Sequence, residues 1–476
     1  MGARRKGKRE HTEVSRPLQP PDAPAAQESP VSDAPSEPLP AVSAAIATQR
    51  KPSGFSNLIL HLHPRSVPQE ALKLDRTFGL GGMAVMLLLV LIATGVLLLF
   101  VYQPAPERAY ASVLELEDKV PFGAFVRAIH HWAGNGLILV AFLHMLRVFY
   151  TGAFHPPRRF NWILGLALLG LVMASNFTGY LLPWDQLAYW AVTIGTGMLE
   201  YVPLAGPALM NAARGGPEVG AKTLTTFFVL HIAMLPILLF LLTAFHFWLV
   251  RKAGGVMLPQ MPGEPGLRRT LIPTSPNLTR REGATALVVL GVLLVFAAVF
   301  EAPLQEQANT GMSPNPAKAP WYFMGVQELL VHLHPAFAVL VVPLLAIAFL
   351  VMLPYFKLGE VPTGFWFHSK IGRRAAFAAA GVALVLTPLY ILANEFLLNW
   401  QKLLPFLPQA ASNGLVPVML WAVLAFGLYW AVRRFMAASR LDAVQAVFTF
   451  LLVAFLVLTV TGIFFRGEAM HLAWPW

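Results

Sequence analysis

Cysteine is absent from the 476 residues of this chain. The chain therefore forms no disulfide bond, attaches no haem through thioether bonds and supplies no thiolate to an iron–sulfur cluster. A redox centre held by this chain needs histidine or other non-thiol ligands. Charge is also scarce, because Asp, Glu, Lys and Arg make up 12% of the residues whereas 56% are hydrophobic. This composition excludes an ordinary soluble domain and indicates an integral membrane protein.

Nine long stretches without a charged residue follow one another along the chain. Each can supply the roughly 20 apolar residues that a membrane-spanning helix needs. They cover residues 77–106, 128–146, 160–184, 223–250, 283–300, 329–356, 375–394, 403–432 and 443–465. The uncharged stretch 186–199 is shorter and contains two glycines, so we interpret it as an interfacial segment. The predicted fold class is all-α, a polytopic membrane protein with about nine transmembrane helices.

The charges between these stretches are distributed unevenly. If the N-terminus is cytoplasmic, the connections after spans two, four, six and eight carry 16 Lys and Arg against 4 acidic residues. The opposite connections and the C-terminus carry 8 against 12. Because basic residues gather on the cytoplasmic side, we expect the N-terminus inside and the C-terminus outside. Anionic lipid headgroups then account for the net charge of +11, and no nucleic acid is needed as a partner.

Residues 1–50 differ in composition from the rest of the chain. They begin with the basic cluster "ARRKGKR" and continue with Pro, Ala, Ser and Glu, without apolar periodicity. This pattern predicts a disordered cytoplasmic tail. The tail also lacks the apolar core of a cleaved signal peptide.

Four histidines lie inside two of the apolar stretches at matched intervals. His130 and His144 are 14 residues apart, and His231 and His246 are 15 apart. On an α-helix these intervals place each pair within about 40° to 60° of one face and about 21–23 Å apart along the axis. One metal cannot bridge that distance, but two b-type haems, each held by one imidazole from each helix, fit it. His131 points to the far side of its helix; a buried histidine can alternatively serve only as a hydrogen-bonding group.

Two pairs of glycines and two arginines fit the same arrangement. Glycine leaves room for a porphyrin face beside the backbone, and each pair shares the 14-residue interval of the first histidines. Arg127 and Arg147 lie three residues outside His130 and His144, where they are candidates to pair with haem propionates, or simply to anchor the helix at the interface. The glycine pairs are Gly81 with Gly95, and Gly165 with Gly179.

These features together resemble cytochrome b of the bc-type quinol oxidoreductases, and most of all the chloroplast-type b cytochrome. The first half carries R-x-x-H at 127–130, "TGYLLPWDQLAYWAV" at 178–192, "RGG" at 214–216 and "TLTTFF" at 223–228. The second half, from "SPNLTRREG" at 275–283, resembles the subunit IV-like part, here fused. The resemblance covers about 55–435. It implies a di-haem four-helix bundle over 51–255 and a C-terminal domain over 256–435. The predicted tail over 1–50 and an extra ninth helix with the outer C-terminus over 436–476 lie outside the resemblance.

The resemblance implies that His130 and His231 ligate a low-potential haem near the outer face, and that His144 and His246 ligate a high-potential haem near the cytoplasm. Quinol would be oxidised at an outer site and quinone reduced at an inner site, with a contribution to the proton gradient. The second electron would pass to a Rieske iron–sulfur protein and then to a c-type cytochrome. The family also implies a homodimeric complex in the inner membrane of a bacterium.

The outer quinol site departs from the family pattern. Where the family usually reads P-E-W-Y, this chain has Pro320 in place of the proton-accepting glutamate, followed by Trp321 and Tyr322. We expect Glu328 to take the proton in its place, or else Asp185, near Tyr180. The alternative for Glu328 is that it is an exposed interfacial charge. 

Two further family positions also differ, and one pair matches. Gly79 stands where the chloroplast-type protein binds a third haem covalently, so none is expected, and Thr226 replaces a usual arginine. Arg251 and Lys252, just after the last haem-ligating histidine, match and are candidates to bind an anionic quinone form, or to anchor the helix.

Two other classes of function were weighed. A di-haem membrane anchor that relays electrons between a dehydrogenase and quinone needs the histidines but not the second half of the chain. A transporter without haem leaves the matched histidine and glycine intervals unexplained. The sequence therefore favours the oxidoreductase subunit.

Overall fold

The computed structural model describes residues 63–263, 269–359 and 362–474, so the predicted tail lies outside the described residues. Nine helices in these ranges are long and apolar enough to cross a membrane, which confirms the predicted fold class. They run over Leu80–Leu98, Gly123–Tyr150, Arg159–Tyr180, Ala221–Lys252, Thr274–Val299, Phe337–Tyr355, Lys370–Phe396, Ala411–Phe435 and Arg440–Phe464.

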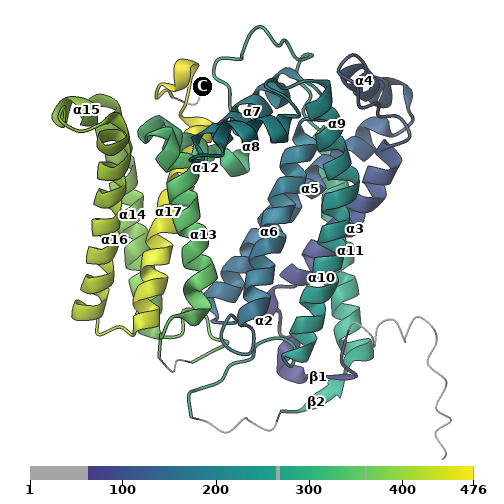
Figure 1. Cartoon of the computed structure of the whole chain (residues 1–476). Helices are drawn as coiled ribbons and strands as arrows, with labels where there is room; N and C mark the ends of the chain where they lie inside the picture. Colours follow the sequence, from purple (N-terminus) through teal and green to yellow (C-terminus); the bar gives the residue numbers. More distant parts are fainter. Residues whose placement is uncertain (1–62, 264–268, 360–361, 475–476) are drawn as a thin grey trace, which may run out of the picture. The chain divides into compact units, whose positions relative to one another are not determined.

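The first five of these helices form one packed group (Figure 1). They are α3 (Leu80–Leu98), α5 (Gly123–Tyr150), α6 (Arg159–Tyr180), the continuous α9 (Ala221–Val229), η3 (Leu230–Met234) and α10 (Leu235–Lys252), and α11 (Thr274–Val299). α3 packs on α5, α6 on α10, and α11 on both α3 and α5. Apolar side chains from all five meet in one core, with Leu87, Ala133, Val172, Leu239 and Leu293 among its buried members.

The remaining four spanning helices follow in the second half of the chain, and the last three of them share the second large core. They are η5 (Phe337–Val341) with α13 (Val342–Met352) and η6 (Leu353–Tyr355), α14 (Lys370–Phe396), η7 (Ala411–Leu415) with α16 (Val416–Phe435), and α17 (Arg440–Phe464). Alanines make the close contact between α14 and α17 possible, because small side chains let two backbones approach. Ser369 caps α14, and Ser439 with Asp442 forms a capping box on α17.

Short elements connect the spanning helices. They are β1 (Ser66–Pro68), η1 (Gln69–Leu72), α2 (Leu74–Thr77), α4 (Ala109–Lys119), α7 (Gln186–Gly197), η2 (Met198–Tyr201), α8 (Gly206–Arg214), β2 (Leu271–Pro273), η4 (Trp321–Phe323), α12 (Met324–His332), α15 (Trp400–Leu403) and η8 (Glu468–Met470). β1 and β2 pair antiparallel, with Val67 opposite Ile272. The predicted interfacial segment 186–199 is mostly α7, and the predicted run 329–356 is divided between α12 and the helix that starts at Phe337.

Three spanning helices contain a π-helical turn, and each turn is followed by a proline at the second residue of the next α-helical part. The turns η3, η5 and η7 precede Pro236, Pro343 and Pro417. Proline cannot donate a backbone hydrogen bond and crowds the carbonyl four residues earlier, so the helix widens by one residue just before it. The first of these turns contains His231.

Candidate functional site

The four histidines lie in two pairs between α5 and the helix formed by α9, η3 and α10. The ring centres of His130 and His231 are 6.1 Å apart, with an angle of 73° between the rings. Those of His144 and His246 are 6.4 Å apart at 75°. The pairing predicted from the spacing is therefore present in the structure. His131 instead packs edge-on against Trp132, with ring centres 4.8 Å apart.

A π-helical turn explains how unequal spacings give matched pairs. His130 and His144 are 14 residues apart, whereas His231 and His246 are 15 apart. The turn at Leu230–Met234 absorbs about one extra residue, so the longer interval spans nearly the same height and angle as the shorter one. The sequence pattern alone left the difference between the two histidine intervals unexplained. The local widening of the helix accounts for it.

Each of the four predicted glycines lies beside one histidine ring. A Cβ atom at Gly95 would lie 3.3 Å from Cε1 of His130, and one at Gly179 would lie 2.5 Å from Cε1 of His231. The corresponding distances are 3.8 Å from Gly81 to His144 and 3.6 Å from Gly165 to His246. α3 therefore presents a glycine to each of the two paired histidines of α5, and α6 presents one to each histidine of the partner helix. The 14-residue interval that both glycine pairs share with His130 and His144 reflects these contacts.

Hydrogen bonds orient the two imidazoles of the His130–His231 pair. The carbonyl of Ser175 accepts from Nδ1 of His231 at 2.9 Å. Thr94 donates its hydroxyl to the carbonyl of Val90 and lies 2.9 Å from Nδ1 of His130, so it accepts there. Both rings then carry their proton on Nδ1, which leaves the Nε2 lone pair for a metal. Thr94 and Ser175 were not predicted from the sequence, although a hydroxyl residue directly before Gly95 was a visible signal.

These pairs fit the iron of a haem. An imidazole nitrogen binds a metal at about 2 Å, so two rings on opposite sides of one metal have centres about 6 Å apart, as both pairs do. Glycine beside each ring leaves space next to the backbone. Nδ1 of His246 is buried and has no hydrogen-bond partner among the described residues. Buried polar atoms normally have such a partner, so the imidazole of His246 has one polar atom left to pair.

The two flanking arginines are both buried but differ in their partners. Arg127 forms an ion pair with Glu117 and donates to the carbonyls of Ala302 and Pro303 at 2.9 and 2.8 Å. Arg147 donates to the carbonyl of Arg76 at 2.7 Å, and the neighbouring charges that act on it, those of Arg76 and Arg158, are positive. An anion beside Arg147 would relieve that repulsion.

The aromatic segment that contains the predicted quinol-site residues packs against α5, which bears a histidine of each pair, and against α6. Trp321 donates its Nε1–H to Oδ1 of Asn135 on α5 at 2.6 Å. The ring of Phe323 lies 5.9 Å from that of Phe177 on α6. Tyr322, between them, packs on the core of the first five helices, and burial raises the pKa of its hydroxyl. Pro320 precedes η4 directly.

Asp185 is a buried carboxylate whose charge acts on Tyr180, the other predicted residue of the outer site on this side of the chain. It caps α7, because one oxygen accepts from the amide of Ala188 at 2.8 Å and the other from that of Gln305 at 3.1 Å. Its charge acts on the hydroxyl of Tyr180, the last residue of α6. Burial raises the pKa of Asp185 above its ordinary value, against the lowering effect of these hydrogen bonds.

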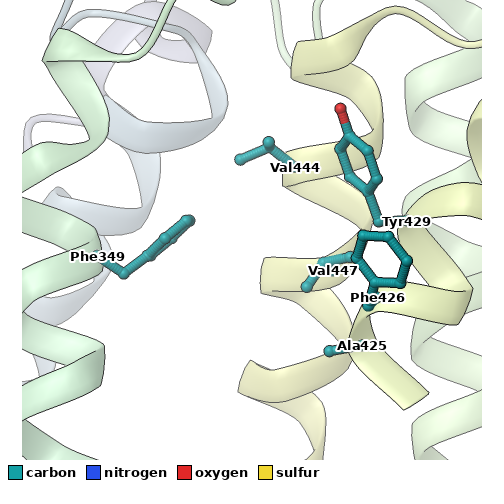
Figure 2. A pocket seen from close by; sticks show the side chains of 6 residues that line it. All are labelled: Phe349, Ala425, Phe426, Tyr429, Val444 and Val447. Atoms are coloured by element: carbon teal, nitrogen blue, oxygen red, sulfur yellow. The ribbon is translucent and has the colours of Figure 1, made fainter. Parts of the chain in front are cut away.

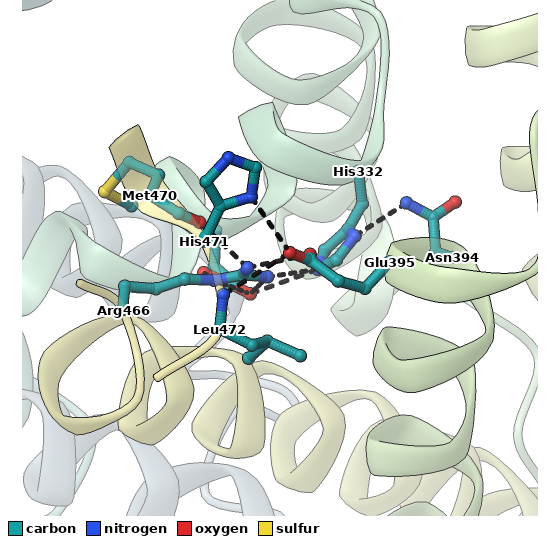
Figure 3. A network of polar contacts seen from close by, with 8 residues as sticks. His332, Asn394, Glu395, Arg466, Met470, His471 and Leu472 are labelled. Atoms are coloured by element: carbon teal, nitrogen blue, oxygen red, sulfur yellow. Dashed lines mark hydrogen bonds and ion pairs between the residues drawn. The ribbon is translucent and has the colours of Figure 1, made fainter. Parts of the chain in front are cut away.

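Glu328 has different surroundings. It is 0% exposed, so the alternative that it is an exposed interfacial charge is wrong. Arg466 donates to both of its oxygens at 3.0 and 2.5 Å, and Nε2 of His332 lies 3.0 Å from one of them (Figure 3). These partners lower its pKa although burial alone would raise it. As a proton acceptor Glu328 stays a prediction, and its ion pair favours Asp185 for that role.

Arg251 and Lys252 end α10 and are exposed, and the ammonium of Lys252 lies 5.0 Å from the ring centre of Trp248. Thr226, at the position where relatives usually have arginine, is exposed on α9. Gly79 has a φ of +68°, and a Cβ atom there would lie 3.0 Å from Cγ2 of Thr285. A side chain of any kind is therefore strained at that position.

A cavity of about 200 Å³ lies beside α13, α16 and α17, away from the histidines (Figure 2). Its lining residues are Phe349, Ala425, Phe426, Tyr429, Val444 and Val447. Apart from the hydroxyl of Tyr429 these side chains are apolar, so they cannot orient a quinone headgroup. We therefore do not include this cavity in the site.

Comparison with known proteins places these features in one family. Residues 66–254 match the family model described as cytochrome b/b6/petB. Over 192 residues the chain is 44% identical to cytochrome b6 of Heliomicrobium gestii, covering 40% of this chain and 88% of the relative. It is 43% identical over 175 residues to the menaquinol:cytochrome c reductase cytochrome b subunit of Geobacillus thermodenitrificans, covering 37% and 78%. A chain of a solved hyperthermophilic respiratory Complex III has a similar fold, with a TM-score of 0.62 at 21% identity over 86% of this chain and 95% of that one.

Proposed function

The chain belongs to the cytochrome b/b6 family, and from this premise we propose that it is the cytochrome b subunit of a bacterial respiratory quinol:cytochrome c oxidoreductase, active only within that complex. The observation that carries the proposal is that two histidine pairs lie between the same two helices, with a glycine beside each ring. Such paired imidazoles suit two stacked haems and no single metal centre.

Two non-covalent b-type haems are assigned to these pairs. His130 and His231 hold the outer, low-potential haem, and His144 and His246 hold the inner, high-potential one. When bound, the haems pass single electrons from one side of the membrane to the other. Thr94 and Ser175 keep the outer imidazoles in the tautomer that binds iron. The φ of Gly79 supports the expectation that no third haem is attached covalently there.

Quinol is oxidised at the outer site formed by Pro320, Trp321, Tyr322, Tyr180 and Asp185. Trp321 and Tyr322 lie against the helices that bear the histidines, so a quinol beside them is close to the outer pair. Because Pro320 cannot take a proton, Asp185 receives it: a buried carboxylate with a raised pKa binds a proton more readily than an exposed one. Glu328 is the second candidate for that role.

Quinone is reduced at an inner site near the ends of α5 and α10. Arg251 and Lys252 attract an anionic form of the quinone there, and Arg147 pairs with a propionate of the inner haem. The second electron from quinol leaves through a Rieske iron–sulfur protein to a c-type cytochrome, both separate chains because this one has no cysteine. This bifurcation contributes to the proton gradient, and the complex is a homodimer in the cytoplasmic membrane.

Haem analysis of the purified chain tests the proposal. Pyridine haemochrome analysis should give two b-type haems per chain, both extractable with acid acetone. His231→Leu should lose the outer haem and abolish quinol:cytochrome c turnover, whereas the adjacent control His131→Leu should keep both haems, because His131 packs on Trp132. One haem or none in the wild-type chain, haem that resists extraction, or haem loss in His131→Leu would refute the ligand assignment.

The second candidate function is a di-haem anchor that relays electrons between a dehydrogenase and quinone. The histidine pairs alone would serve it equally well. The contact of Trp321 with Asn135 favours the oxidoreductase, because it joins the second half of the chain to the haem-bearing helix. A purified complex with two haems but without quinol:cytochrome c activity would favour the anchor.

A further inference from the structure

The ninth spanning helix, α17, lies beyond the part of the chain that matches the family model, which ends at residue 254. It is nevertheless packed inside the second half of the chain, in contact with α12, α14 and α16 (Figure 1). α12 is the short helix that follows Trp321 and Tyr322 directly. The extra helix is therefore a direct neighbour of the segment proposed to form the quinol site.

Two glycines bring α12 and α17 into close contact. A Cβ atom at Gly325 would lie 2.6 Å from the ring of Phe455 and 2.7 Å from Oγ1 of Thr459. One at Gly462 would lie 3.1 Å from the side chain and 3.2 Å from the carbonyl of Met324. At both points a glycine backbone of one helix lies directly against atoms of the other, so a shift of α17 must move α12.

Polar contacts also join the residues just before Pro320 to the C-terminal end of α17 and to the residues that follow it. Lys318, two residues before Pro320, donates its ammonium to the carbonyl of Ile463 at 2.9 Å. Oδ1 of Asn315 accepts from the amide of Ala469 at 2.6 Å. The segment that leads into the quinol-site aromatics is thus fixed to α17 and to the residues just after it.

Arg466 is the strongest of these links. It is 3% exposed and follows α17 by two residues. Its guanidinium joins three elements: it donates to Glu328 on α12, to Oε2 of Glu395 on α14 at 2.9 Å, and to the carbonyl of Met470 at 2.9 Å (Figure 3). A buried guanidinium with so many carboxylate bonds tolerates little movement.

The acidic partners of Arg466 are themselves supported. Nε2 of His332, one turn after Glu328, donates to the Glu328 carboxylate at 3.0 Å, and Nδ1 of His332 accepts from Nδ2 of Asn394 on α14 at 2.9 Å. The amide of Leu472 donates to Oε1 of Glu395 at 3.3 Å. The buried face of α12, formed by Met324, Gly325, Glu328 and His332, is turned to this network, whereas Trp321 bonds α5.

We propose that Arg466 is a positioning residue for quinol oxidation: through Glu328 it fixes α12, and α12 fixes Trp321 and Tyr322 against α5 and α6. The inference rests on the proposed outer quinol site and adds a role for the ninth helix. Arg466 bonds to Glu328, Glu395 and Met470, and it acts on the aromatic residues through α12 without touching quinol.

The test compares variants in the intact complex, with turnover expressed per haem. Arg466→Gln should raise the KM for quinol at least tenfold, with both haems present at wild-type content. Arg466→Lys keeps the charge and one bond to Glu328, so it should recover to within about threefold of wild type. The control Arg373→Gln, at the opposite end of α14 and exposed, should leave KM unchanged.

Glu328→Gln separates positioning from proton transfer. If Glu328 acts through Arg466, Glu328→Gln raises KM as Arg466→Gln does, the double variant is no worse than either single one, and the pH profile of turnover keeps its shape. A flattened acid side of that profile in Glu328→Gln would make Glu328 the proton acceptor and overturn the proposal. If Arg466→Gln loses haem, Lys318→Met tests the same attachment of the quinol-site segment to α17. It should also raise the KM for quinol.

Values of KM and turnover per haem within twofold of wild type in Arg466→Gln would overturn the inference. That result leaves the proposed function intact, because the wild-type complex still oxidises quinol. A wild-type complex without quinol oxidation would refute the proposed function instead.

Discussion

The buried carboxylates show how far single residues can be interpreted from sequence. Pro320 marks a missing proton acceptor, and the sequence offered Glu328 and Asp185 as replacements on spacing alone. Only the structure shows that Glu328 is paired with Arg466, a residue 138 positions away. No local pattern encodes such a distant partner. An arginine at the end of an apolar helix, together with two acids elsewhere at helix ends, was the available signal.

Asp185 carries a prediction at the residue scale. Its carboxylate accepts a proton only when ionised, and burial raises its pKa, so turnover should fall on the acid side at a higher pH than an exposed aspartate would give. Asp185→Asn should lower quinol:cytochrome c turnover at least tenfold at neutral pH. Asparagine retains an oxygen for the amide of Ala188, so the cap on α7 should persist.

The measurement is turnover against pH for wild type and Asp185→Asn, with haem content as the folding control. Turnover of Asp185→Asn within twofold of wild type across the pH range would remove Asp185 from the proton path.

Among the helices, the spans and their order were predictable, because a run of about 20 apolar residues has few other structures available in lipid. The nine runs and the short segment 186–199 all appear as helices in the described residues. The π-helical turns were not predicted, although each precedes a proline. The division of run 329–356 was also missed, since hydropathy does not register the break at 333–336.

The turn at Leu230–Met234 gives a prediction at the element scale. Pro236 is the local reason for the widened turn, and the widening brings the 15-residue interval of His231 and His246 into register with α5. Pro236→Ala allows regular α-helical bonding and should rotate His231 away from His130. We expect partial loss or a spectral shift of the outer haem, with the inner haem unchanged.

Low-temperature absorption spectra that resolve the two b haems measure this effect. Pro343→Ala is the matched control, because it alters a similar turn that carries no histidine. Unchanged spectra in Pro236→Ala would show that tertiary packing, and not the proline, maintains the turn.

At the scale of the whole molecule, the histidine helices could be predicted almost completely, whereas the second half could be predicted only as a set of spans. Three of the four paired histidines lie on regular α-helix, whose periodicity is visible in the sequence, and only His231 lies in a π-helical turn. The contacts of α17 depend instead on small residues and buried ions from distant parts of the chain, such as Gly325 with Phe455. Such contacts leave no periodic signal.

The orientation of the chain is the last prediction. Nine spans put the two termini on opposite sides of the membrane, and the excess of 16 Lys and Arg over 4 acidic residues assigns the connections after even-numbered spans to the cytoplasm. An alkaline phosphatase fused after Trp476 should therefore be active, because this reporter folds only after export. The same reporter inserted at Ala437, in the connection between α16 and α17, should be inactive. Activity at Ala437 together with an inactive C-terminal fusion would invert the topology. It would also place Asp185 and the quinol-site aromatics on the cytoplasmic side, where protons from quinol could not add to the gradient.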